Sequence, residues 1–299
     1  MNLSEQDLNT LCNTAILAAK EAGELISTYA HREVKVNRKP VESGLHKVSG
    51  GTSLASQVVT EVDIKSQELI LRHLTPTIKK YNLGLLTEEA TDDKSRFEKD
   101  QFWCIDPLDG TLSFTEGKDG YSVSIALVSK DGDPLIGVVF DPVKKNLYHA
   151  TKGTGAFKNN QKLALNNSSG IFSFITDRSF TKHKKFDEIK AKLEQYSQSI
   201  GCVEFKCINH GGAAMNSIWV MENSPSCYFK LPKKEVGGGS IWDFAATTCI
   251  FTELGLIAGD FKGQPLDLNS NESTFMNQHG VLFSSDKSIA NFIMNTINK

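Results

Sequence analysis

A run of short apolar segments, each separated from the next by polar and turn-forming residues, fills the chain between residues 85 and 157. Segments of this length are typical of β-strands, and consecutive strands joined by short turns pair in antiparallel order. No other feature constrains the fold as strongly, because strands in this number must pair with one another in a sheet. We expect strands at residues 85–87, 102–105, 123–127, 135–140, 147–150 and 156–157.

Two amphipathic helices precede these strands. Apolar residues recur at helical spacing from Ser4 to about Tyr29, and again after Thr60. Ser4 with Asp7, and Thr60 with Asp63, have the spacing of side chains that cap a helix N-terminus. The second helix is therefore expected to carry Asp63 in its first turn.

After residue 170, strands alternate with helices, which is typical of an α/β arrangement. We expect strands at residues 171–176, 203–205, 227–231 and 281–284, and helices at residues 186–196, 213–221, 243–254 and 288–297. The predicted fold class is α/β (α+β) in two domains. Residues 1–168 form an α+β domain with a mainly antiparallel sheet and two helices, and residues 169–299 form an α/β domain with a mixed sheet and flanking helices.

The charge composition limits the classes of partner. The 299 residues include 33 Lys and Arg and 35 Asp and Glu, so the formal net charge is -2 at pH 7. A nucleic acid polymer requires a basic surface, so we expect no such partner. No apolar stretch approaches the roughly 18 residues of a transmembrane helix, and the first residues lack the basic and apolar regions of a signal peptide. We therefore expect a cytoplasmic protein without a membrane partner.

The segment Asp106–Thr111, with the sequence Asp-Pro-Leu-Asp-Gly-Thr, directly follows the strand expected at residues 102–105. Asp, Pro and Gly each favour turns, so the segment taken alone predicts only a turn. Its context indicates more, because two carboxylates three residues apart lie beside a Gly-Thr pair whose backbone N–H groups can bind an anion. This arrangement suits a metal ion with a bound phosphate.

Further carboxylates can converge on this segment. Glu88 and Glu89 follow another expected strand, and Asp243 lies near the start of an expected helix. Each has an ordinary explanation by itself: a solvated acidic loop for the glutamates, and a favourable interaction with the helix dipole for Asp243. A hard cation such as Mg²⁺, however, takes several oxygen ligands. The candidate ligands are Glu88, Glu89, Asp106, Asp109 and Asp243.

Taken in order, these motifs resemble those of the inositol monophosphatase superfamily of Mg²⁺-dependent, lithium-sensitive phosphatases. The family pattern is an upstream Asp, then Glu-Glu, then Asp-Pro-Ile/Leu-Asp-Gly-Ser/Thr, then Trp-Asp-x-Ala-Ala. The matching segments here are Asp63, Glu88–Glu89, Asp106–Thr111 and Trp242–Ala246, and the resemblance extends over about residues 5 to 290. It implies a layered αβαβα sandwich and a Mg²⁺-dependent phosphomonoesterase that uses two or three ions.

The resemblance implies a shared metal site in which Asp106 bridges two ions. The first ion is held by Glu88, Asp106 and the backbone carbonyl of Leu108, and the second by Asp106, Asp109 and Asp243. Glu89 either tunes a ligand from outside the coordination sphere or holds a third ion.

The resemblance also implies which groups carry out hydrolysis. Asp63 and Thr111 match the pair that orients and deprotonates the metal-activated water, with the carboxylate as the base because a hydroxyl alone is too weak. The backbone N–H groups of Gly110 and Thr111 match those that hold the phosphate oxygens as charge builds on them. No covalent intermediate with the enzyme is implied.

The residues around the expected substrate leave its identity open. The inositol-specific branch has an acidic residue where this chain has Lys230, and a lysine can pair with a second phosphate but cannot accept hydrogen bonds from hydroxyls. The segment Asp177–Thr181 resembles the Arg-Ser-His region of 3′(2′),5′-bisphosphate nucleotidases, with Phe180 in place of the His. The turn that contacts the substrate ring in the family is matched by Gly211, Gly212 and Ala213, with Gly212 in place of a Ser or Thr.

The predicted function is hydrolysis of a small soluble phosphate ester, as in a 3′(2′),5′-bisphosphate nucleotidase or an inositol monophosphatase. The alternatives are a sugar bisphosphatase of the same superfamily and a catalytically silent module that senses metal or phosphate. The silent module predicts missing ligands, whereas every expected ligand is present here. The expected partner is the small phosphate ester, and the resembling family also suggests a homodimer.

Overall fold

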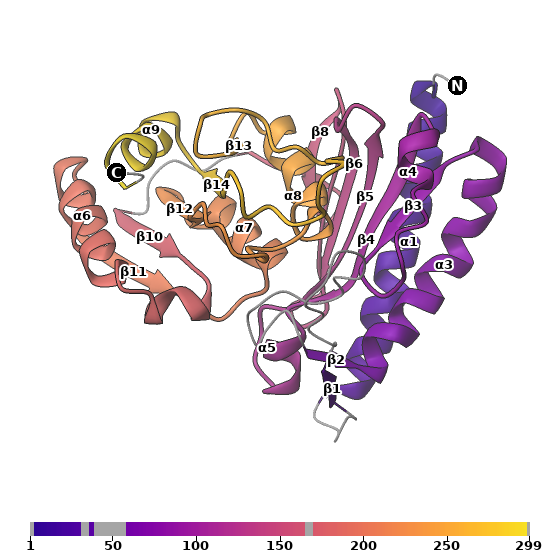
Figure 1. Ribbon diagram of the computed structural model, residues 1–299, viewed down its shortest axis with the longest axis horizontal. Coiled ribbons are helices and arrows are strands. Elements are labelled where there is room, and N and C mark those ends of the chain that lie inside the picture. The colour runs from indigo at the N-terminus through magenta and orange to yellow at the C-terminus, as the bar shows by residue number, and fades with distance from the viewer. Residues whose placement is uncertain (1–2, 31–35, 39–57, 165–169, 298–299) are drawn as a thin grey trace.

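The computed structural model describes residues 3–30, 36–38, 58–164 and 170–297. Its main elements lie in five layers (Figure 1): a helix pair, a seven-stranded sheet, a second helix pair, a five-stranded sheet and a third helix pair. The predicted αβαβα sandwich is therefore confirmed. Within the ranges described, no helix is both long enough and apolar enough to cross a membrane.

The first helix pair consists of α1 (Glu5–Tyr29) and α3 (Glu61–Tyr81), which pack on each other and on one face of the seven-stranded sheet. Both helices begin as the sequence predicts. In each, a Ser or Thr cap and an Asp three residues later exchange hydrogen bonds, which satisfies N–H groups that a helix start leaves unpaired. The cap of α3 places Asp63 in the first turn.

The seven-stranded sheet follows chain order from β3 to β9. Its first two strands run parallel and every later neighbour is antiparallel, so the predicted mainly antiparallel sheet is confirmed. The strands are β3 (Gly84–Thr87), β4 (Gln101–Asp109), β5 (Ser122–Ser129), β6 (Pro134–Asp141), β7 (Asn146–Thr151), β8 (Gly155–Lys158) and β9 (Gln161–Lys162).

The five-stranded sheet has the order β11-β10-β12-β14-β13 and is mixed, as predicted. β10 is parallel to both of its neighbours, and β14 is antiparallel to both of its own. The helices α6 and α9 cover its outer face, and α7 and α8 lie between the two sheets (Figure 1). The bounds are β10 (Ile171–Ile175), α6 (Phe186–Ser199), β11 (Glu204–Ile208), α7 (Ala213–Glu222), β12 (Ser226–Lys230), α8 (Ile241–Glu253), β13 (Ile257–Gly259), β14 (Val281–Ser284) and α9 (Lys287–Thr296).

Small residues bring α8 close to the seven-stranded sheet. Gly137 in β6 lies directly against α8, where a Cβ atom would collide with the carbonyl oxygen of Ala246. Ala245 and Ala246 are themselves fully buried. The two alanines of the Trp242–Ala246 motif therefore set the distance between helix and sheet, and with it the position of Asp243.

Several short elements were not predicted, because none exceeds five residues and such lengths show no recognisable hydrophobic period. They are β1 (Val36–Arg38), β2 (Val58–Thr60), α4 (Ser95–Glu98), α5 (Thr111–Thr115), β9, the 3-10 helix η1 (Arg178–Lys182) and β13. The strand predicted at residues 102–105 also continues further, since Asp106 still pairs with Ser124 and Asp109 with Ser122.

The predicted division into domains at residues 168 and 169 falls within a segment outside the described residues and stays a prediction. One buried cluster joins the two facing sheets. It includes Phe102 and Val139 of the first sheet, Ile250 of α8 and Phe283 of the second sheet. The helices α7 and α8 thus share their apolar surface with both sheets.

Candidate active site

The predicted site residues meet at one end of the seven-stranded sheet, where β3 and β4 end and the helices α3, α5, α7 and α8 begin. Helix starts carry unpaired N–H groups and a partial positive charge, both of which favour carboxylates and phosphate. The fold therefore gathers anion-binding backbone at the same place as the acidic side chains.

Asp106 and Asp109 are the acidic residues of β4. Residues three apart on a regular strand point to opposite faces of the sheet. Here the pairing with β5 shifts register between the two, and this irregularity lets both carboxylates approach Asp243. Gly110 then turns the chain into α5 with a φ of 85°, and a Cβ atom there would lie 2.9 Å from the carbonyl oxygen of Gly120. This turn requires glycine.

Asp106, Asp109 and Asp243 form the carboxylate cluster, in which one oxygen from each lies within 4.8 Å of the others. Asp106 and Asp109 are 2% and 5% exposed. Burial, followed by the charge of neighbouring carboxylates, raises the pKa of Asp109 to about 8 and that of Asp243 to about 6, and holds the pKa of Asp106 well above its ordinary value. The charge of Lys230 opposes part of this rise at Asp243.

These residues fit the predicted cofactor. Burial, and after it the repulsion between neighbouring carboxylates, disfavours the charged forms of these three side chains. A divalent cation supplies the charge that is lacking, and carboxylate oxygens are the hard ligands that Mg²⁺ takes. The resemblance found in the sequence and the chemistry of these carboxylate ligands therefore point to the same metal, Mg²⁺.

Asp109 is held by the start of α7. Its two carboxylate oxygens accept hydrogen bonds from the backbone N–H groups of Ala213 and Ala214, at 3.0 and 2.9 Å. Gly212, which departs from the family's Ser or Thr, makes this approach possible because a Cβ atom there would collide with the Asp109 carboxylate. The Gly212 N–H in turn donates to the carbonyl oxygen of Gly120 at 2.7 Å.

Glu88 and Leu108 lie beside the carboxylate cluster. The Glu88 N–H donates to the carbonyl oxygen of Ile105 at 3.1 Å, and the Glu88 charge raises the pKa of Asp106. Glu88 is nevertheless outside the tight group of three. The carbonyl oxygen of Leu108 lies 3.1 Å from the Thr111 hydroxyl. Metal binding by Glu88 and Leu108 stays a prediction.

The structure brings Asp63 and Thr111 together, 48 positions apart in the chain. One Asp63 oxygen accepts the N–H and hydroxyl of Thr60, at 2.8 and 2.6 Å, and the other lies 2.9 Å from the Thr111 hydroxyl oxygen. Burial raises the pKa of Asp63 to about 6, and the charge of Glu88 adds to the rise. A carboxylate with this pKa is ionised near neutral pH and remains basic enough to accept a proton.

The predicted phosphate-binding groups are the backbone N–H groups of Gly110 and Thr111, at the start of α5. Among the residues that the structure describes, neither N–H donates to a backbone or side-chain acceptor. Both groups thus remain available to an anion next to the carboxylate cluster. Their role in phosphate binding stays a prediction.

Two residues of α3 that support the site were not identified from the sequence. Ser66 donates to the carbonyl oxygen of Pro107 at 2.7 Å, and Gln67 accepts the N–H of Glu89 at 3.1 Å. Both lie three or four positions after Asp63 and therefore share its helix face. The sequence did contain a signal for these two residues, because polar side chains follow Asp63 at helical spacing in a helix that also has an apolar face.

Lys230 and Gly211, both predicted to bind substrate, are engaged with the protein itself. The Lys230 ammonium pairs with Asp177 at 2.5 Å, and the two side chains are 15% and 22% exposed. Gly211 packs tightly, since a Cβ atom there would lie 2.5 Å from Asn216 Oδ1 and 2.6 Å from the Trp219 ring. Substrate contacts by Gly211, Gly212, Ala213 and Lys230 stay predictions.

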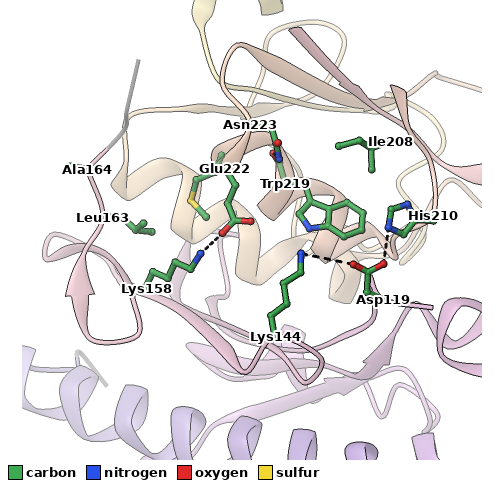
Figure 2. Close-up of a pocket in the computed structure, with 11 residues that line it drawn as sticks. Asp119, Lys144, Lys158, Leu163, Ala164, Ile208, His210, Trp219, Glu222 and Asn223 are labelled. Carbon is green, nitrogen blue, oxygen red and sulfur yellow. Dashed lines mark hydrogen bonds and ion pairs between the residues drawn. The ribbon is translucent and has the colours of Figure 1, made fainter. Parts of the chain in front are cut away.

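A depression of about 570 Å³ lies along α7, apart from the carboxylate cluster (Figure 2). None of the predicted site residues lines it, although His210 at its edge precedes Gly211. Its charged side chains are paired with one another: Lys158 with Glu222, and Asp119 with His210 and Lys144. Its two carboxylates, Asp119 and Glu222, are each paired with a basic side chain and do not form a cluster like that of Asp106, Asp109 and Asp243.

In the absence of divalent cations, the free energy of unfolding is expected to fall as the pH rises from about 5 to about 8. The pKa of Asp109 is about 8 in the folded protein and ordinary in the unfolded chain, so the folded state binds more protons over this range. Raising the pH removes those protons and leaves buried charges that repel each other.

Thermal unfolding in EDTA and in saturating Mg²⁺ measures this effect. Mg²⁺ should raise Tm most at the higher pH, because the cation binds the ionised carboxylates. The Asp109→Asn variant should show a flatter Tm against pH in EDTA. A wild-type Tm that does not change with pH in EDTA would contradict the raised pKa of the carboxylate cluster.

Comparisons with known proteins agree with this geometry. The family model described as "Inositol monophosphatase family" matches residues 7–297. Nus factor SuhB of Haemophilus influenzae is 30% identical over 258 residues, 85% of this chain and 86% of that protein. Inositol monophosphatase 1 of Mus musculus is 26% identical over 257 residues, 86% of this chain and 85% of that protein.

Solved structures agree on the fold. Two structures of inositol monophosphatase-II from Staphylococcus aureus, one with bound inositol monophosphate and one with bound 2′-AMP, have TM-scores of 0.67 and 0.68. Both are 22% identical to this chain and cover 96% of it and 94% of their own chain.

The fold and the site define a phosphatase class that acts on small phosphate esters and generally depends on Mg²⁺. Within that class, the chain belongs to the inositol monophosphatase family. The resemblance identified from the motifs is thus confirmed over nearly the whole chain.

Proposed function

We propose that this chain is a Mg²⁺-dependent phosphomonoesterase that hydrolyses a small soluble phosphate ester. The observation that carries the proposal is the carboxylate cluster of Asp106, Asp109 and Asp243 beside the hydrogen-bonded pair of Asp63 and Thr111. A cation site next to a buried base is what attack of water on a phosphate ester requires.

The silent sensing module is the rival proposal, and the family includes relatives called Nus factors. A silent module has no use for a general base. Here the Thr111 hydroxyl lies 2.9 Å from Asp63, which is fully buried and has a pKa raised to about 6. Buried carboxylates with raised pKa values are found more often at active sites than elsewhere, and the contact with the Thr111 hydroxyl goes beyond what the cap of α3 requires, so this pair favours the enzyme.

The proposed Mg²⁺ ligands are the side chains of Glu88, Asp106, Asp109 and Asp243 and the carbonyl oxygen of Leu108. When bound, Mg²⁺ supplies positive charge against the phosphate oxygens and lowers the pKa of water. The chain orients two of these ligands in advance. The start of α7 holds Asp109, and the Ser240 N–H donates to Asp243 at 2.8 Å.

The residues of the chain account for the movement of the proton. Water attacks phosphorus, a new P–O bond forms, the ester P–O bond breaks, and the alcohol leaves with a proton from solvent. Thr111 can accept a hydrogen bond from the attacking water while it donates to Asp63, so Asp63 takes up the water's proton. The N–H groups of Gly110 and Thr111 donate to the phosphate oxygens, which become more negative in the transition state.

Two substrate classes remain the leading proposals, a nucleoside 3′,5′-bisphosphate and an inositol monophosphate, with a sugar bisphosphate as the third. Lys230 supports the nucleoside bisphosphate, because its ammonium can pair with a second phosphate but cannot accept hydrogen bonds from inositol hydroxyls. The staphylococcal structures, one with inositol monophosphate and one with 2′-AMP, support keeping nucleotide and inositol phosphate esters as substrate classes, although 2′-AMP has no second phosphate.

Phosphate release from adenosine 3′,5′-bisphosphate, inositol 1-phosphate and fructose 1,6-bisphosphate tests the proposal. Each substrate is assayed with Mg²⁺, with Mg²⁺ and Li⁺, and with EDTA. We expect Mg²⁺-dependent turnover of at least one ester, inhibition by Li⁺ and none in EDTA. Binding of Mg²⁺ without turnover of any ester would favour the sensing module instead.

Quaternary structure and location are further proposals that follow from the family. We propose a homodimer in the cytoplasm. Light scattering of the purified chain tests the first, because a dimer has twice the 32.9 kDa of one chain. Fractionation of cells tests the second.

A further inference from the structure

The pairing of the five-stranded sheet places Asp177 next to Lys230. β10 and β12 are parallel neighbours (Figure 1), with Ile175 opposite Tyr228. Parallel strands end at the same edge of a sheet, so two positions further along each chain brings Asp177 level with Lys230. The ion pair at 2.5 Å confirms that these side chains lie on the same face.

Asp177 is the centre of a small polar network. One carboxylate oxygen accepts the Lys230 ammonium, and the other accepts the Tyr228 hydroxyl at 2.8 Å and the Asn216 amide at 3.4 Å. Tyr228 and Asn216 are fully buried. The carboxylate is therefore fixed from two directions, by β12 and by the same helix α7 whose start binds Asp109.

Lys230 extends from this anchor toward the proposed catalytic site. Its ammonium lies 5.8 Å from the ring centre of Tyr228 and 5.9 Å from that of Phe244, the residue after Asp243. Within the described part of the chain, one of its three N–H donors is used by Asp177, which leaves two for a ligand.

We propose that Asp177 is a positioning residue that holds the Lys230 ammonium at the edge of the phosphatase site, where it selects substrates that carry a second anionic group. The inference rests on the proposed function and names the substrate class. A lysine side chain loses rotamer freedom when it is fixed, and the pair with Asp177 incurs that cost before substrate binds. Without Asp177, the Lys230 side chain can adopt other rotamers, in which its ammonium no longer contacts the second anionic group.

The test compares Asp177→Asn, Asp177→Glu, Lys230→Met and the double variant Asp177→Asn with Lys230→Met. The readout is the ratio of kcat/KM for adenosine 3′,5′-bisphosphate to that for inositol 1-phosphate. We expect Asp177→Asn to lower this ratio about tenfold, mainly through KM for the bisphosphate. Lys230→Met should lower it at least as much, the double variant no further than Lys230→Met alone, and Asp177→Glu should restore part of the loss.

A general loss of structure lowers both activities together and leaves the ratio unchanged, so an unchanged ratio in Asp177→Asn overturns the inference. Losses that multiply in the double variant overturn it as well, because they show that the two residues act separately. If the wild type hydrolyses neither ester, the proposed function fails by itself. Equilibrium binding of adenosine 3′,5′-bisphosphate then decides: about tenfold weaker binding to Asp177→Asn supports the pair, and equal binding rejects it.

Discussion

The Asp109→Asn variant is expected to hydrolyse phosphate esters with a kcat/KM about 1000-fold or more below that of the wild type. Asp109 is 5% exposed and belongs to the carboxylate cluster that we propose binds Mg²⁺. The amide keeps the shape of the side chain but removes a charge and one ligand oxygen. Because a bound cation contributes several kcal/mol to stabilisation of the transition state, its weakened binding appears in the rate.

Two controls separate the chemistry of Asp109 from its role in the fold. In EDTA, the Tm of Asp109→Asn should stay close to that of the wild type, since the loss of one of the two N–H hydrogen bonds from α7 is offset by weaker repulsion within the cluster. Asp133→Asn, at a side chain that is 63% exposed and pairs with Lys152, should retain full activity. Near-normal turnover by Asp109→Asn would rule out the carboxylate cluster as the metal site.

The Asp63→Asn variant is expected to lose about 100-fold to 10,000-fold in kcat, the range that general base catalysis contributes. The amide oxygen can still accept the two hydrogen bonds from Thr60 that cap α3. The amide nitrogen, however, replaces the oxygen that lies 2.9 Å from the Thr111 hydroxyl and cannot accept its proton. Steady-state kinetics with saturating Mg²⁺ and a preferred ester measure the loss.

The chain contains a matched control for this variant. Asp7 caps α1 through the same contacts, at 3.0 Å to the Ser4 N–H and 2.6 Å to the Ser4 hydroxyl, at a capping box that is not part of the site. Asp7→Asn should therefore cost similar or less stability and leave kcat unchanged. If both variants lose kcat in proportion to their loss of Tm, Asp63 acts through the fold and not as the base.

Much of the fold could be predicted from the sequence because its signals are local. The helices from Glu5 and Glu61 begin at capping pairs that lie three residues apart, and their apolar faces repeat every three to four residues. The meander of strands was predicted from short apolar runs and turns. The segment Asp106–Thr111 indicated a cation site for the same reason, since its acidic and turn-forming residues are contiguous.

The end of β4 and the presence of the short elements were not predicted from the sequence. β4 continues through Asp106 and Asp109 with an irregular register. The hydrophobic pattern of this part of the strand cannot be distinguished from that of a turn. The helix α5 has only five residues, and its helical shape follows from the turn at Gly110 and the packing around it. Patterns of this length carry too few positions to separate one structure from another.

The longer helices and strands, the helix caps, the family motifs and the acidic residues could be predicted from the sequence, because each depends on neighbours a few positions away. Only the tertiary structure decided that Asp109 is bound by N–H groups 104 and 105 residues further along, and that Lys230 is anchored by Asp177, 53 residues before it. Such contacts depend on strand register and on how closely α7 and α8 pack between the sheets. They arise when the whole core forms, and no local pattern specifies them.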